Sequence, residues 1–199
     1  LGAGAVIMTM DPEHDMFKMG GLRTRMPLVF WTFLAGSASL AALPLVTAGF
    51  FSKDPILFFA AASTAGSTWL WLAGFVAALV TSLYTFRMVF VTFFGVQQKQ
   101  AHYRAGPSIT IPLVVLGGLS VIAGWIQMPP SLGRFTPFSD FLIRTLPAAT
   151  LKAVPAGLES GLEIATAVIA LVGLYLAWQF YIRTPMVVNE EMVGQMKTG

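Results

Sequence analysis

The sequence predicts an all-α fold, a polytopic bundle of transmembrane helices. Of its 199 residues, 56% are hydrophobic and only 11% are charged, whereas about a quarter of the residues in a typical soluble domain are charged. The mean hydropathy is +0.74 and Phe occurs 16 times, which excludes a disordered chain, because disordered segments are poor in apolar and aromatic residues. The apolar runs lack the alternation that is typical of β-strands.

The polar residues exclude several kinds of chemistry. The chain contains no Cys, so it has no disulfide, thiolate zinc site, Cys-ligated iron–sulfur cluster or Cys nucleophile. The two His, His14 and His102, are too few for a histidine-built centre, and we predict no metal site. The net charge of +3 comes from Lys and Arg scattered between apolar runs. We therefore expect cations that anchor helix ends at the bilayer and no nucleic-acid partner.

Apolar runs of about 20 residues, enough for a helix to cross a bilayer, divide the chain into segments. We predict a single membrane domain over residues 1–182. Its parts, with the tail that follows, are a partial helix at 1–10, spans at 28–62, 69–94, 109–128 and 161–182, and a polar cytoplasmic tail at 183–199. Because the first apolar run is too short to span, we expect an internal piece of a longer chain.

The segments between the spans are polar. Those at 11–25 and 95–108 are predicted as loops, 63–68 as a turn, and 129–160 as a long loop that contains a short interfacial helix at Ser139–Leu146. Seven Lys and Arg lie on the side that holds the first two loops and the tail, against three on the other side. The positive-inside rule makes the first side cytoplasmic.

The adjacent pair Lys53-Asp54 interrupts a long apolar run, and two structures are consistent with it. If residues 28–51 form one straight helix, the pair is solvated at the outer interface and contributes about 0–1 kcal/mol. If the helix breaks at Pro44, a half-helix resumes at Lys53, with Pro55 in its first turn and Asp54 near the N-cap. A broken helix at membrane depth lines water or buried protein, and the pair would then be a functional site.

Other charged residues near or within spans also have two readings. Arg87 lies about two turns from the end of the span at 69–94. Its long side chain can reach the interface, or it can be a fixed counter-charge to a buried carboxylate, because Arg does not release its proton. Glu159 and Glu163 open the last helix, where the N-terminal dipole favours negative charge.

Three runs of sequence together resemble a known family. They are K-M-G-G-L-R at Lys18–Arg23, L-P-L-V-T-A-G-F-F-S-K-D-P-I-L at Leu43–Leu57 and T-S-L-Y-T-F-R-M-V-F at Thr81–Phe90. They resemble the chain L family of the bacterial NADH–quinone oxidoreductase, respiratory complex I, which is chain 5 in mitochondria. The likeness is continuous from Leu1 to about Ile182. Large subunits of multisubunit cation/proton antiporters and membrane-bound hydrogenases share the G-F-x-S-K element but are less similar around Asp54 and Arg87.

The resemblance implies an antiporter-like proton-channel subunit with discontinuous helices. It therefore favours one discontinuous transmembrane helix, broken near 44–53, within the span at 28–62. Lys53 matches the family's proton-carrying lysine and Asp54 the carboxylate beside it, so the resemblance implies proton transfer by both. Arg87 becomes the candidate counter-charge. Other channel residues of the family precede Leu1, so we expect part of one half-channel, on its exit side.

The predicted function is proton translocation, driven by quinone reduction in other subunits of the NADH:quinone oxidoreductase, with no redox chemistry on this chain. The alternatives are a subunit of a multisubunit cation/proton antiporter or membrane-bound hydrogenase, and a non-transporting membrane scaffold. We expect no cofactor here; FMN, iron–sulfur clusters, NADH and quinone belong to other subunits. The expected partners are the lipid bilayer and other membrane subunits of complex I, especially antiporter-like ones. The expected location is the bacterial inner (plasma) membrane, or the mitochondrial inner membrane in a eukaryote, as a multi-pass protein.

Overall fold

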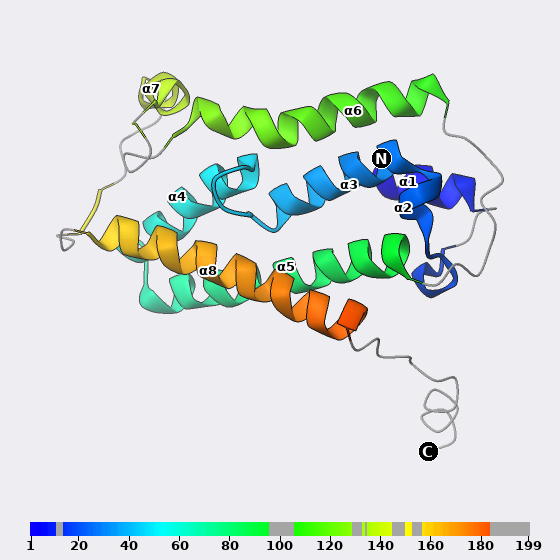
Figure 1. Cartoon of the computed structure of the whole chain (residues 1–199). Helices are drawn as coiled ribbons and strands as arrows, with labels where there is room; N and C mark the ends of the chain where they lie inside the picture. The colour runs from blue at the N-terminus through cyan, green and yellow to red at the C-terminus, as the bar shows by residue number, and fades with distance from the viewer. Residues whose placement is uncertain are drawn as a thin grey trace, which may run out of the picture.

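The computed structural model describes residues 1–10, 14–95, 106–128, 133, 135–144, 150–152 and 157–183, and these residues form a helical bundle (Figure 1). Among them, the β pairing is limited to an isolated bridge between Ser63 and Leu151. The predicted all-α class is confirmed. His102, most of the loop at 95–108 and the tail after Arg183 lie outside the described residues.

The helices follow one another with short connections where the structure describes the chain. In order they are α1 (Gly2–Thr9), the 3-10 turn η1 (Met16–Lys18), α2 (Leu22–Arg25), α3 (Pro27–Leu40), α4 (Ala48–Ala62), α5 (Thr68–Phe94), α6 (Pro107–Ile122), the 3-10 turn η2 (Ala123–Ile126), α7 (Pro137–Ile143), α8 (Leu158–Trp178) and the π-helical turn η4 (Gln179–Arg183). The short helix α7 overlaps the interfacial helix expected at Ser139–Leu146, and residues 145–149 lie outside the described part.

In the part of the chain that the structure describes, three helical stretches are long and apolar enough to cross a membrane, namely Thr68–Phe94, Pro107–Ile126 and Leu158–Arg183. The remaining predicted span, at 28–62, is divided between α3, with 14 residues, and α4, with 15. At 1.5 Å per residue each is about 21–23 Å long, so neither alone crosses a hydrocarbon layer of about 30 Å. The chain is thus a polytopic membrane bundle that contains one discontinuous helix.

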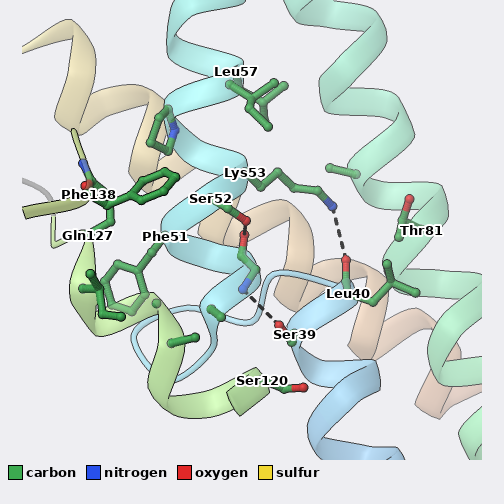
Figure 2. Close-up of a pocket in the computed structure, with 18 of the residues that line it drawn as sticks. Ser39, Leu40, Phe51, Ser52, Lys53, Leu57, Thr81, Ser120, Gln127 and Phe138 are labelled. Carbon is green, nitrogen blue, oxygen red and sulfur yellow. Dashed lines mark hydrogen bonds between the residues drawn. The ribbon is translucent and has the colours of Figure 1, made fainter. Parts of the chain in front are cut away.

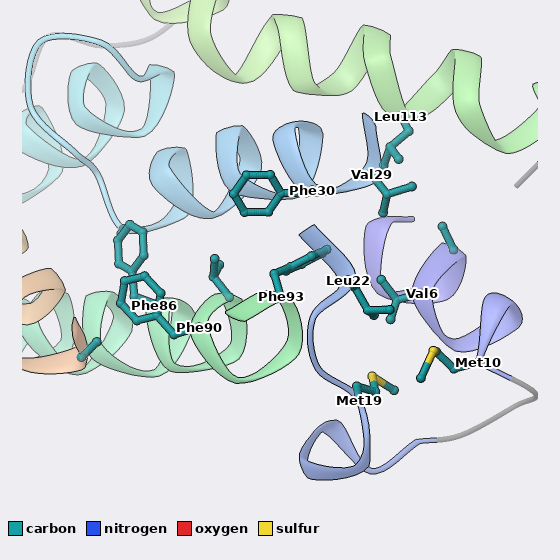
Figure 3. Packing of buried hydrophobic residues seen from close by; sticks show 14 residues of the cluster. Val6, Met10, Met19, Leu22, Val29, Phe30, Phe86, Phe90, Phe93 and Leu113 are labelled. Carbon is teal, nitrogen blue, oxygen red and sulfur yellow. The ribbon is translucent and has the colours of Figure 1, made fainter. Parts of the chain in front are cut away.

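The prediction of a polar loop at 11–25 is wrong over residues 14–25, the part that the structure describes. Residues 14–25 contain η1 and α2, and the side chains of Met19 and Leu22 are only 5% and 0% exposed. They pack against α1 in the main apolar cluster (Figure 3). The charged side chains of this segment stay at the surface, where the Arg23 guanidinium lies 4.9 Å from the centre of the Phe94 ring. In this short segment the apolar side chains therefore face the core and the charged side chains face the surface.

Aromatic packing fixes α3 against the C-terminal half of α5. Phe93 lies with its ring centre 5.3 Å from those of both Phe30 and Phe33, and Phe86 is also buried in this cluster (Figure 3). Each such pair contributes about 0.5–1.5 kcal/mol beyond its buried area. This packing holds the first half of α3 against α5.

The helices α5 and α8 approach each other closely. Ser82 is fully buried and its Oγ donates a hydrogen bond to the Ala170 carbonyl at 2.7 Å. A Cβ on Gly173 would lie only 2.6 Å from the Ser82 Cβ, so a glycine is required for this approach. Small residues of this kind let membrane helices pack backbone to backbone. This contact positions α8 beside the discontinuous helix, which it also touches.

Candidate functional site

The interruption between α3 and α4 occupies residues 41–47. Within it, Ala42 and Leu45 have φ angles of 58° and 68°, in the left-handed region that residues with a side chain rarely adopt. Such a conformation costs on the order of 1–3 kcal/mol per residue and persists only where the surrounding structure imposes it. Strain of this kind concentrates at functional sites, so the break is a candidate site.

The second half-helix begins earlier than the sequence predicts. It starts at Ala48 and not at Lys53, so the break near 44–53 is wrong at its C-terminal end. Asp54 is therefore not near the N-cap, and Pro55 lies inside the helix rather than in its first turn. Pro55 therefore removes the hydrogen bond to the carbonyl four residues earlier, and its ring crowds that carbonyl.

Hydroxyl groups pair with the backbone on both sides of the break. The Gly49 N–H donates to the Ser39 Oγ at 3.0 Å, which satisfies one of the N–H groups that the start of a helix leaves unpaired. The Thr47 hydroxyl donates to the Leu43 carbonyl at 2.7 Å, within the break. Ser39, in the last turn of α3, is a residue that the sequence analysis missed. The signal for Ser39 was a small hydroxyl side chain just before the break. Such side chains are common in apolar helices, so the signal was not specific.

Lys53 connects the two halves of the discontinuous helix. Its Nζ donates a long hydrogen bond, 3.5 Å, to the carbonyl of Leu40 (Figure 2). Leu40 is the last residue of α3, where unpaired carbonyls form the negative end of the helix dipole. The amine of the second half-helix thus lies at the terminus of the first, an interaction that favours a cation.

A cavity of about 1100 Å³ lies next to this contact. Its walls come from α3, α4, α5, α6, η2 and α7 and are mostly apolar. The charged or polar side chains that line it are Ser39, Ser52, Lys53, Thr81, Ser120, Gln127 and Ser139 (Figure 2). Lys53 is the charged group among these lining residues, so the amine faces a space large enough to hold several waters.

The short helix α7 is fixed at the edge of this cavity. The Gln127 side-chain amide donates to the Ser139 Oγ at 2.7 Å, and the Ser139 N–H donates to the Gln127 Oε1 at 3.1 Å. The second bond satisfies an N–H in the first turn of α7. Phe138 and Leu142 of α7 thereby become part of the cavity wall.

Asp54 points away from the cavity, toward α8. Adjacent helical residues leave the axis about 100° apart, so Asp54 lies beside Thr166 and not among the cavity-lining residues. It is 9% exposed, and within the described part of the chain neither carboxylate oxygen has a hydrogen-bond partner. The Thr166 hydroxyl donates to the Leu162 carbonyl at 2.7 Å, so its proton is not available to Asp54. A buried carboxylate without a donor is costly when ionised.

Arg87 lies apart from the cavity. Its guanidinium is 5.6 Å from the ring centres of both Phe17 and Tyr181, distances at which a cation interacts favourably with an aromatic face. Thr81, which lines the cavity, is six residues earlier, about 9 Å along α5. The structure therefore places Lys53 at the helix break and the cavity, Asp54 against α8, and Arg87 elsewhere. In the described part of the chain, no group of three or more His, Cys, Asp or Glu residues could hold a metal ion.

Comparison with known proteins shows which family the sequence resembles. The family described as NADH:quinone oxidoreductase/Mrp antiporter, transmembrane, matches residues 1–81, which include the break and the Lys53-Asp54 pair. The subunit L of NADH-quinone oxidoreductase from Escherichia coli (strain K12) is 46% identical over 177 residues, and that from Pseudomonas aeruginosa is 43% identical over 177 residues. Chain 5 of NADH-ubiquinone oxidoreductase from Cryptococcus neoformans is 35% identical over 195 residues.

These alignments cover most of this chain but only part of each relative. The two bacterial matches cover 89% of this chain and 26% of the relative, and the fungal match covers 94% and 29%. The chain thus spans about a quarter of the length of the curated relatives that it matches.

Proposed function

Because this chain belongs to the family of NADH–quinone oxidoreductase subunit L and NADH–ubiquinone oxidoreductase chain 5, we propose that it forms part of a proton half-channel. In this proposal the passage of protons is driven by quinone reduction in other subunits of the complex. The relatives carry the names of oxidoreductase subunits, and this piece contributes proton translocation, not redox chemistry.

The observation that carries the proposal is the position of Lys53 at the break. Irregular backbone at membrane depth is tolerated where it is buried in protein or lines a wet cavity, and Lys53 both reaches the end of α3 and lines the cavity. Transporters place ion sites at the ends of broken helices in the same way. An ionisable residue inside a membrane segment is a functional candidate, and Lys, unlike Arg, can release its proton when its surroundings change.

In the proposed mechanism one proton passes from Lys53 to Asp54. The two side chains lie on different faces of α4, so water carries the proton between them. An N–H bond of the Lys53 ammonium breaks, an O–H bond forms on the Asp54 carboxylate, and both groups become neutral. Reloading of Lys53 from the cavity restores the ammonium. Arg87, which keeps its proton, is proposed to supply fixed positive charge near the cytoplasmic end of α5.

The rest of the assembly follows from the same proposal. The partners are other membrane subunits of respiratory complex I, above all antiporter-like ones, and FMN, iron–sulfur clusters, NADH and quinone are held by other subunits. The proposed location is the bacterial inner membrane, or the mitochondrial inner membrane in a eukaryote.

A second candidate function is cation/proton antiport, because the matched family also includes Mrp antiporters. The same amine and carboxylate could exchange a proton against a metal cation. Transport that requires sodium would favour this candidate, and transport that is independent of sodium would favour the first.

The test is Lys53→Met in the intact complex, with Lys152→Met as the matched control. Lys152 is an exposed cation whose Nζ donates to the Gly66 carbonyl, so the same chemical change is made outside the cavity. In sealed vesicles, NADH-driven proton uptake should be lost in Lys53→Met and retained in Lys152→Met, with equal amounts of assembled complex. Normal uptake by an assembled Lys53→Met complex would contradict the proposal and favour a non-transporting membrane scaffold.

A further inference from the structure

Glu163 is an acidic residue that the helix dipole does not explain. Of the two glutamates near the start of α8, only Glu159 lies in the first turn. The effect of the dipole falls off within that turn. Glu163 lies in the second turn of a helix that is long and apolar enough to cross the membrane. A carboxylate is costly there, so it is a functional candidate.

Glu163 lies across a helix interface from the buried carboxylate of Asp54. The helices α4 and α8 are in contact, and Thr166 and Glu163 of α8 both lie close enough to Asp54 to act on its carboxylate electrostatically. Thr166 is 2% exposed and lies one turn after Glu163 on the same face of α8. Asp54 is itself nine-tenths buried, and its two oxygens have no hydrogen-bond partner in the described part of the chain.

Exposure rises along this interface toward the start of α8. Asp54 is buried and Glu163 is half-buried, whereas residues 157, 159 and 160, which precede Glu163, are exposed. The start of α8 is on the side with fewer cations, which the positive-inside rule places outside. Asp54 and Glu163 therefore lead from the helix break toward the outer water.

We infer that Glu163 is a further proton-transfer residue, which takes the proton from Asp54 and releases it toward the outer aqueous face along α8. This inference rests on the proposed function of the Lys53-Asp54 pair. The O–H bond of protonated Asp54 breaks and an O–H bond forms on the Glu163 carboxylate, directly or through one water. Glu163 then returns to its carboxylate form by giving that proton to solvent water near the exposed start of α8.

The test compares Glu163→Gln with Glu159→Gln in the intact complex. Both replace a carboxylate by an amide of the same shape on the same helix, but Glu159 is solvent-exposed and lies outside the proposed route. We expect Glu163→Gln to slow NADH-driven proton pumping in sealed vesicles by about 100-fold, the lower end of the contribution of a positioned proton-transfer group. Glu163→Asp, which keeps the exchangeable proton, should recover most of the rate, and Glu159→Gln should pump normally.

The outcomes separate this inference from the proposed function. Normal pumping by Glu163→Gln, while Lys53→Met does not pump, would overturn the role of Glu163 alone. Normal pumping by both variants would overturn the proposed function as well. Equal loss in Glu163→Gln and Glu163→Asp, with the complex fully assembled, would show a structural role and would also overturn the inference.

Discussion

The junction of the two half-helices depends on Gly49, and Gly49→Ala tests this directly. A Cβ at Gly49 would collide with the Ser39 carbonyl oxygen and lie 2.7 Å from its carbon, whereas non-bonded carbons are in contact at about 3.5–4.0 Å. The halves must therefore move apart by about 1 Å. Such overpacking costs about 1–3 kcal/mol, and weakening the bond from Gly49 N to Ser39 Oγ adds about 1 kcal/mol.

The matched control is Gly118→Ala in α6, where an added Cβ meets nothing within 4 Å. There alanine favours the helix by about 0.5–1 kcal/mol. The assay is thermal unfolding of the detergent-solubilised complex, with proton pumping measured in parallel. We expect Gly49→Ala to unfold at a lower temperature than the parent and to pump less, because Lys53 is displaced from the Leu40 carbonyl. A Gly49→Ala complex as stable and as active as Gly118→Ala would refute the reasoning.

Two further predictions concern packing and orientation. Ser82→Ala removes the hydrogen bond to the Ala170 carbonyl and should lower stability by about 1 kcal/mol, measured as an earlier thermal transition; an unchanged transition would mean that this bond does not hold α5 to α8. A cysteine introduced at Gln98, which lies outside the described residues, should be labelled by an impermeant reagent from the cytoplasmic face. The reason is that seven of the ten loop and tail cations lie on that side, as the positive-inside rule requires. Labelling from the other face would reverse the orientation.

Composition and run length were sufficient to predict the all-α membrane class, because bilayer thickness sets the length of an apolar helix. The residues alone did not decide between a straight and a broken helix at Lys53. That choice depends on tertiary contacts, here the Ser39 Oγ at the Gly49 N–H and the Lys53 amine at the Leu40 carbonyl. Neither contact leaves a periodic signal in the sequence.

The sequence also did not predict in which directions the Lys53 and Asp54 side chains point. Lys53 and Asp54 read as one ion pair because they are adjacent, yet one lines the cavity and the other is buried against α8. A register error of five residues at the start of α4 was enough to misplace Pro55 and Asp54. Glu163 gave a signal, a charge inside an apolar span, but the helix dipole accounted for it until the first turn was located.

The measurement that tests the central claim most directly is proton pumping by Lys53→Arg beside Lys53→Met. Arg keeps the positive charge near Asp54 and at the Leu40 carbonyl but does not release its proton. If Lys53 carries the proton, Lys53→Arg should impair NADH-driven pumping in sealed vesicles about as severely as Lys53→Met, with the complex assembled in both. Near-normal pumping by Lys53→Arg would contradict the account, because Lys53 would then act only as a fixed charge.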